Sequence, residues 1–159
     1  MLFRSLALFL TLFIMNPVIT EIYTEAYQPL SEGTINQTEA FNKAMDPLRT
    51  FMFKQVRSED LALFIQISGS EPVTDITQVS NQALIPAFII SELKTSFIMG
   101  FLLFIPFIVI DLVVASTLMS LGMMMLPPVM ISLPFKILLF ILVDGWNLLI
   151  KYIVAGISV

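Results

Sequence analysis

The chain has 159 residues, of which 57% are hydrophobic and only 13% are charged, and its mean hydropathy is +0.92. A soluble domain usually carries about 45–50% apolar and about 25% charged residues, so this composition predicts an integral membrane protein. The sequence contains no Cys and no His, which excludes disulfides, thiol nucleophiles and imidazole chemistry, and its net charge of −4 argues against a nucleic-acid partner.

An apolar segment from about Leu6 to Ile19 is the first predicted element. It follows Arg4, as in a signal peptide, but "NPVITEIY" provides no small-x-small cleavage site after it. We therefore interpret residues 1–20 as a retained apolar helix ending near Pro17. This helix is short for a membrane span, which needs about 20 residues.

Residues 21–83 form the only polar region, with nine acidic and four basic side chains. The stretch "YQPLSEG" within it is rich in turn-forming residues. The region is too long for the positive-inside rule to decide its side, but its acidity fits the translocated side of the membrane. We expect a small helical domain outside the lipid.

Three helices are predicted inside this polar region. Thr34 and Gln37 fit a capping box for a short helix over about 37–45. Asp46-Pro47 predicts the start of a second helix, because Asp is a good N-cap and Pro suits the first helical position. A third helix is expected over 58–69, followed by a loop up to residue 82.

Residues 84–159 are almost continuously apolar. Proline should distort or break this run at two places, because it removes a backbone donor and clashes with the preceding turn. We expect a kink or a break at Pro106 and a break at Pro127-Pro128, and the predicted helices cover about 84–104, 107–125 and 131–155. The fold class is therefore all-α, with kinked apolar helices and helical hairpins.

Charged residues lie in or beside these apolar helices, where a central charge costs roughly 2.5–3.5 kcal/mol. They are Glu92, Lys94, Asp111, Lys136, Asp144 and Lys151. In a continuous last helix, Asp144 and Lys151 would lie about 80° and about 60° from Lys136, on one face. This face should contact another subunit or a wet lumen. Alternatively, the lysines snorkel to the headgroups and Asp144 forms a structural ion pair.

Two carboxylates raise the question of catalysis. An intramembrane aspartyl protease needs two aspartates that share a proton at close range. The contexts "IDLVVAS" and "LVDGWNLL" lack the Gly-x-Gly-Asp pattern of those enzymes. Lone acids in apolar helices also suit an ion-coupled transporter, which stays open as an alternative, as does a membrane scaffold with no lumen.

Three consecutive methionines precede two prolines in "LGMMMLPPVM". Met is unbranched and adaptable, and neighbours on a helix point about 100° apart, so three in a row cannot share one face. Gly122 would loosen the backbone before them, and Pro127-Pro128 would fix it after them. The pattern indicates a deformable apolar loop on a rigid footing, or else a Met-rich helix end packed in lipid or core.

Three long runs resemble the FliP family. They are "ALFLTLFIMNPVITEIYTEAYQP" (7–29), "LIPAFIISELKTSFIMGF" (84–101) and "IPFIVIDLVVASTLMSLGMMMLPPVMISLPFKILLFILVDGW" (105–146). The resemblance covers nearly the whole chain from about Leu6. Through "MMMLPP" and "LPFK…LVDGW" the sequence is more similar to the flagellar branch than to the related SctR family of injectisomes, although the injectisome alternative stays open.

This resemblance implies a subunit of the flagellar type III export gate rather than an enzyme, with no cofactor or metal. Copies of the chain would assemble with FliQ- and FliR-type subunits, beside other membrane proteins of the flagellar export apparatus. The gate would lie in the bacterial inner membrane at the flagellar basal body and pass unfolded flagellar proteins. Residues 21–83 would face the periplasm.

The resemblance also implies site residues. The family's methionine-rich loop forms a gasket in the pore, and here it falls on Met123, Met124 and Met125, framed by Gly122, Pro127 and Pro128. From their spacing, we expect intersubunit or lumen contacts from Glu92, Lys94, Asp111, Lys136 and Asp144.

Family members carry a longer N-terminus with a signal-like segment and another hydrophobic segment. The opening "MLFRS" does not match what usually precedes "LALFLT". We therefore expect this chain to be N-terminally truncated relative to the family.

Overall fold

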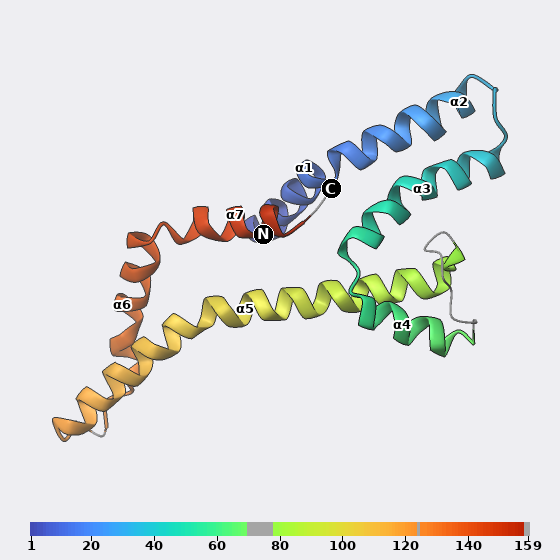
Figure 1. Cartoon of the computed structure of the whole chain (residues 1–159). Helices are drawn as coiled ribbons and strands as arrows, with labels where there is room; N and C mark the ends of the chain where they lie inside the picture. The colour runs from blue at the N-terminus through green and yellow to red at the C-terminus, as the bar shows by residue number, and fades with distance from the viewer. Residues whose placement is uncertain (70–77, 124, 158–159) are drawn as a thin grey trace. The chain divides into compact units, whose positions relative to one another are not determined.

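The computed structural model describes residues 1–69, 78–123 and 125–157, and the secondary-structure elements in these ranges are helical. Two compact units make up the chain, with Met1–Leu93 and Lys94–Ala155 as their main parts. Helix α5 (Asn81–Ser120), yellow-green to orange in Figure 1, contributes residues to both units. The prediction of an all-α chain is confirmed for the described residues.

The first unit begins with a helical hairpin. Helix α1 (Leu2–Ile22) continues without a break through a π-helical turn, η1 (Tyr23–Tyr27), into the short α2 (Gln28–Ser31). The expected turn at "YQPLSEG" therefore begins only after Ser31, and the chain reverses around Gly33. Helix α3 (Gln37–Gln55) then packs back against α1 and η1 (Figure 1).

Helix α3 begins where the sequence predicted, but its cap and its length differ from the prediction. The side chain of Asn36, not Thr34, accepts the Glu39 backbone N–H at 2.9 Å. The helix also passes through Pro47, so the prediction of two separate helices was wrong. Buried Ala40 and Met52 lie on either side of the proline, and a break there would disturb the packing of both.

A small core joins α3, α4 (Ser58–Ile67) and the first turns of α5. Its buried members are Met52, Val79, Ala83 and Leu84, surrounded by Leu48, Phe51, Phe53, Val56, Leu61, Phe64, Ile65 and Phe88. Phe51 and Phe88 meet edge to face at 5.9 Å. Leu84 is fully buried, which stabilises the fold by about 2 kcal/mol.

Two polar contacts tie these helices together. The Arg49 guanidinium donates to the Val79 carbonyl at 2.8 Å and to the Asn81 side chain at the start of α5. Further along α5, the Ser91 hydroxyl accepts the Arg57 backbone N–H at 3.0 Å and donates to Asp60 Oδ2 at 2.9 Å. Since Arg57 is the N-cap of α4 and Asp60 lies in its first turn, a serine from α5 completes the cap of α4.

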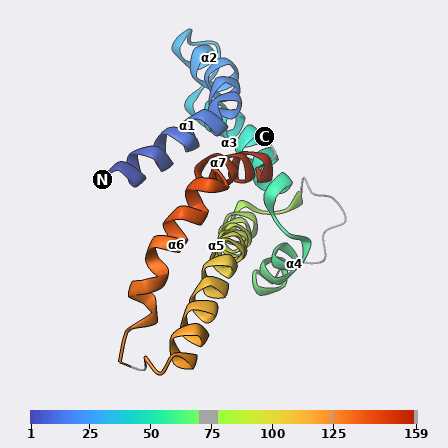
Figure 2. The same ribbon diagram turned by 90° about the vertical axis from the view of Figure 1, so that its left-hand side faces the viewer.

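In the second unit, α5 continues through Pro106 to Ser120. The prediction of two separate helices over 84–104 and 107–125 was therefore wrong, and of the two alternatives at Pro106 a break is not formed. Helix α6 (Pro128–Leu142) returns beside α5, as Figures 1 and 2 both show. Helix α7 (Gly145–Gly156) follows at an angle of 61° to α6. The predicted continuous helix over 131–155 was therefore also wrong.

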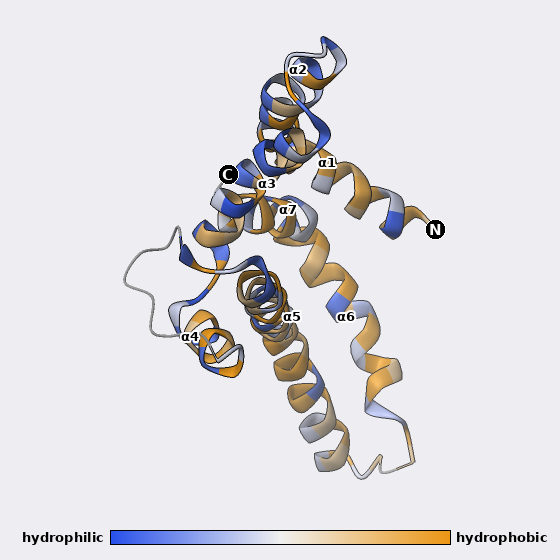
Figure 3. Ribbon diagram, turned by 90° about the vertical axis from the view of Figure 1, so that its right-hand side faces the viewer, coloured by the Kyte–Doolittle hydropathy of each residue, from blue (hydrophilic) through white to orange (hydrophobic). Residues whose placement is uncertain are grey.

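Two helical segments, Leu2–Ser31 and Asn81–Ser120, are long and apolar enough to cross a membrane, and the bent pair α6–α7 would be a third if it forms one span. This count applies to the described residues. Figure 3 shows hydrophilic residues gathered around α2 and α3, whereas α5 and α6 are mostly hydrophobic.

Candidate functional site: an apolar hairpin and its loop

Gly122 ends α5 in a defined geometry. The Gly122 N–H donates to the Met119 carbonyl at 3.1 Å, and the Met123 N–H donates to the Leu118 carbonyl at 3.0 Å. This pair of bonds is the Schellman motif, which needs a left-handed residue at the position after the cap. Gly122 has a φ of +76°, which glycine adopts without steric cost. Gly122 therefore fixes the helix end, whereas the sequence suggested that it loosens the backbone.

The double proline starts α6. Pro127 is the N-cap, with an extended ψ of 116°, and its carbonyl accepts the Met130 N–H at 3.1 Å. Pro128 occupies the first helical position, where no N–H is needed. A residue before proline is held in the extended region, so Pro128 also fixes the conformation of Pro127.

Methionines occupy the tip between these two fixed ends. Met123 is 43% exposed and Met125 is 98% exposed. Met124 lies outside the described residues. The hairpin thus presents large, flexible apolar side chains from a tip whose two flanking helices end and begin in well-defined backbone geometry.

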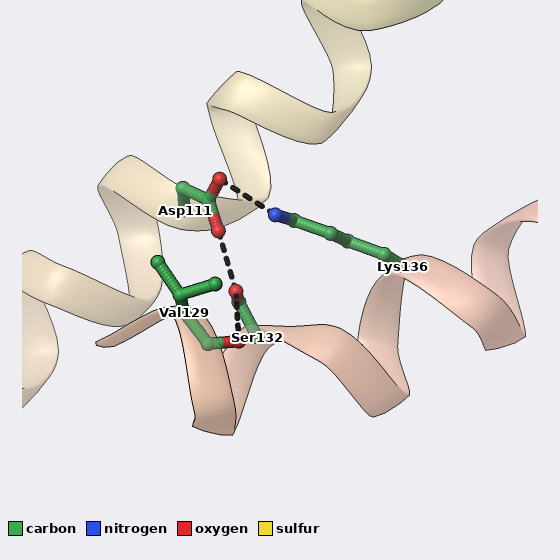
Figure 4. A network of polar contacts seen from close by, with 4 residues as sticks. All are labelled: Asp111, Val129, Ser132 and Lys136. Atoms are coloured by element: carbon green, nitrogen blue, oxygen red, sulfur yellow. Dashed lines mark hydrogen bonds and ion pairs between the residues drawn. The ribbon is translucent and has the colours of Figure 1, made fainter. Parts of the chain in front are cut away.

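A polar network joins α5 to α6 below the loop (Figure 4). The Lys136 ammonium donates to Asp111 Oδ2 at 2.6 Å, and the Ser132 hydroxyl donates to Asp111 Oδ1. The same hydroxyl lies 3.1 Å from the Val129 carbonyl of its own helix. Ser132 is fully buried, whereas the side chains of Lys136 and Asp111 are 18% and 31% exposed.

This network fixes how α6 lies against α5. Ser132 and Lys136 are one helical turn apart, and each takes a different oxygen of the same carboxylate. A slip or rotation of α6 would break both contacts, so the register of the hairpin is specified. The charge of Lys136 is paired, which reduces the cost of placing it among apolar residues.

Asp144 does not share a helix face with Lys136. Helix α6 ends at Leu142, and Asp144 lies exposed at the bend before α7. The expected common face of Lys136, Asp144 and Lys151 depended on a continuous helix and is not formed. An ion pair within the chain does exist, but Asp111 rather than Asp144 provides its carboxylate.

Glu92 and Lys94 lie elsewhere on α5. Glu92 is half-buried in the first unit, and Lys94 is exposed in the second. The side chains that donate hydrogen bonds to Asp111 are therefore Ser132 and Lys136 of α6.

Ser132 and Ser91 were missed by sequence reasoning. Ser132 is the only hydroxyl-bearing residue of α6, and it lies one turn before Lys136. A buried hydroxyl requires a hydrogen-bond partner, so a lone serine in an apolar helix was a usable signal. Its spacing from Lys136 could have pointed to the shared partner.

In the described part of the chain, no cluster of three or more Asp or Glu side chains could hold a metal ion. The described hairpin is held together below its loop by a polar network and presents apolar side chains at its tip.

Comparison of the sequence with known proteins finds a matching family and similar relatives. The FliP family model matches residues 1–153. The flagellar biosynthetic protein FliP of Bacillus subtilis is 56% identical over 147 residues, which covers 92% of this chain and 66% of that protein. The protein of the same name from Borreliella burgdorferi is 53% identical over 148 residues, covering 91% of this chain and 58% of its own. That of Agrobacterium fabrum is 46% identical over 157 residues, covering 97% and 64%. The chain thus spans about two-thirds or less of the length of these relatives.

Proposed function

This chain belongs to the FliP family, and from this premise we propose that it is a non-enzymatic membrane subunit of the flagellar type III protein export gate. The similarity to flagellar biosynthetic proteins carries the proposal, and it favours flagellar over injectisome secretion. The gate would lie in the bacterial inner membrane at the flagellar basal body. Residues 21–83 would face the periplasm, between the apolar segments 1–20 and 84–159.

The exposed apolar surface supports assembly with partners. Phe97, Phe101 and Phe104 of α5 are 77%, 61% and 53% exposed. Apolar surface of this extent must be covered by lipid or by other protein. We propose that further copies of the chain and FliQ- and FliR-type subunits cover it, beside other membrane proteins of the flagellar export apparatus. Unfolded flagellar proteins would be the cargo.

The methionine loop is proposed to be the gasket of the pore. Apolar side chains around a narrow opening exclude water and therefore ions, because dewetting closes the path. Unbranched Met side chains can also yield around a passing polypeptide. The well-defined ends at Gly122 and Pro127-Pro128 support this proposal, because they would return the loop to one position after each passage.

The charges are proposed to serve two purposes. Asp111 and Lys136 hold the hairpin that carries the loop, which the network with Ser132 supports. Glu92, Lys94 and Asp144 are proposed to contact neighbouring subunits or the lumen.

The test is ion leak through the assembled gate. Met123, Met124 and Met125 are replaced together by Ala in the full-length protein of a close relative, co-expressed with FliQ- and FliR-type subunits. We expect increased conductance in planar bilayers with unchanged native mass of the complex. Met119 and Met130, which are 59% and 70% exposed on the flanking helices, provide the matched control for replacement by Ala.

Each outcome separates the proposals. Unchanged conductance of the triple variant would exclude the gasket role of the methionine loop. Failure of the parent chain to assemble with its partners would refute the proposal that it is a gate subunit. The transporter alternative expects Asp111→Asn to abolish proton-dependent uptake in vesicles without disturbing assembly. Both carboxylate oxygens of Asp111 already accept hydrogen bonds from α6, which favours a structural role instead.

A further inference from the structure

The bend between α6 and α7 is built around one residue. Asp144 has a φ of +50°, and within the described ranges no other non-glycine residue has a positive φ. Its N–H donates to the Ile141 carbonyl at 3.1 Å, and its own carbonyl accepts the Leu148 N–H at 3.1 Å. Asp144 therefore closes α6 and opens α7 at the same time.

Close packing on the inside of the bend involves the next residue. Gly145 is buried, and a Cβ there would lie between 2.4 and 2.8 Å from three carbons of the Phe140 ring. The same ring meets Trp146 edge-on, with centroids 5.4 Å apart at 89°. The centroid of the Phe140 ring also lies 6.5 Å from that of Phe107 on α5.

These contacts exist only when the chain is bent. In a continuous helix, Gly145 and Trp146 would point about 140° and about 120° away from Phe140, so neither could touch its ring. The backbone of Asp144 and the packing around Phe140 thus favour the same bent conformation through independent causes.

We propose that Asp144–Gly145 is a fixed elbow, in which Gly145 and Trp146 are positioning residues that hold α7 off the axis of α6 through Phe140. The inference goes beyond the proposed gate and does not depend on it. Helix α6 has 15 residues and α7 has 12, so they are about 22 and 18 Å long. Neither alone crosses a hydrocarbon core of about 30 Å, and the elbow prevents the two from combining into one straight span.

The test measures the bend as a distance. The chain contains no Cys, so spin labels can be placed uniquely by Met130→Cys and Tyr152→Cys, at positions 70% and 67% exposed. At 1.5 Å per residue and a bend of 61°, the labelled backbones are about 29 Å apart, against about 33 Å in a straight helix. The distance is measured by pulsed electron resonance on the whole chain, in detergent and in lipid nanodiscs.

Three variants make the test decisive. Gly145→Ala collides with the Phe140 ring, so we expect a broader distribution shifted by up to about 4 Å toward the straight value. Asp144→Val has the same expectation, because β-branched residues avoid the left-handed region. Asp144→Gly should keep the parent distance. Gly100→Ala is the matched control, since a Cβ there meets nothing within 4 Å.

Either of two results overturns the elbow. The parent chain could show the label-to-label distance of a straight helix, or the distance distribution of Gly145→Ala could match that of the parent. If Gly145→Ala does not fold, the contrast between Asp144→Val and Asp144→Gly decides. This test needs no flagellar partner. The elbow can therefore be refuted while the gate proposal stands, and the gate proposal can be refuted while the elbow stands.

Discussion

Replacing Ser91 by Ala should release α4 from α5. Ser91 is fully buried, and its hydroxyl links the N-cap residue Arg57 to Asp60 in the first turn of α4. In an ordinary capping box these two positions of one helix satisfy each other directly. Here the connection passes through a residue of another helix, so α4 is fully capped only when it is docked on α5.

The size of the effect follows from the two bonds that are lost. A hydrogen bond to a charged group contributes about 1.5–3 kcal/mol, and Asp60 is only 2% exposed, so the full range applies. The Arg57 N–H is only partly buried, and losing its partner costs about 1 kcal/mol. Together the substitution should weaken the docking of α4 by about 3 kcal/mol, which corresponds to roughly a 150-fold change in an opening equilibrium.

Hydrogen exchange resolved by helix is the appropriate assay. In mild detergent, the amides of α4 (Ser58–Ile67) should exchange roughly 150-fold faster in Ser91→Ala than in the parent, because they open locally. Amides in the second half of α5 should not change. Ser116→Ala is the matched control, because the exposed Ser116 hydroxyl only donates to Leu112 of its own helix, at 2.8 Å.

Two results would refute this reasoning. Exchange in α4 within threefold of the parent would mean that water or another donor replaces the serine at no cost. Equal acceleration in every helix would mean that Ser91 supports the whole unit and not the cap of α4.

Two further substitutions test backbone features. Gly122→Ala should lower the free energy of unfolding by about 1–2 kcal/mol because of its positive φ, whereas Gly100→Ala, inside a helix with open space around its Cβ, should raise it by about 0.5–1 kcal/mol. Shifts of the same sign in thermal unfolding would contradict this contrast. Asn36→Ala should cost about 1 kcal/mol through loss of the α3 cap, and Asn36→Asp should restore it; equal stability of the two variants by circular dichroism would exclude the cap.

Features that extend over many residues were predictable from the sequence. The apolar character of α5 and α6 and the helical class follow from composition alone, because burial or lipid exposure of a long helix constrains every position. Helix α4 was also predicted nearly to its bounds, since "SEDLALFIQISG" carries acidic residues in the first turn and a glycine after the end.

Contacts between distant segments were not predictable. Asp111 and Lys136 each stood out as charges in apolar surroundings. Their pairing, however, depends on the register of α6 against α5, which no local sequence pattern specifies. The lone Ser132 of α6 signals that a hydrogen-bond partner exists, but neither it nor Ser91 indicates which helix supplies that partner. The sequence therefore located the charges of the candidate site but could not identify their partners.

Proline misled the prediction of helix ends, and glycine would have corrected it. A proline inside a helix costs about 3 kcal/mol, yet α5 passes through Pro106, because a break in apolar surroundings would leave several backbone groups without partners at several kcal/mol each. Helices α2, α4 and α5 instead end two residues before a glycine with positive φ, namely Gly33, Gly69 and Gly122. Pro127-Pro128 coincides with a break only because Gly122 has already satisfied the end of α5. In apolar helices of this kind, a proline indicates a helix boundary when a C-terminal glycine cap precedes it, and a local distortion otherwise.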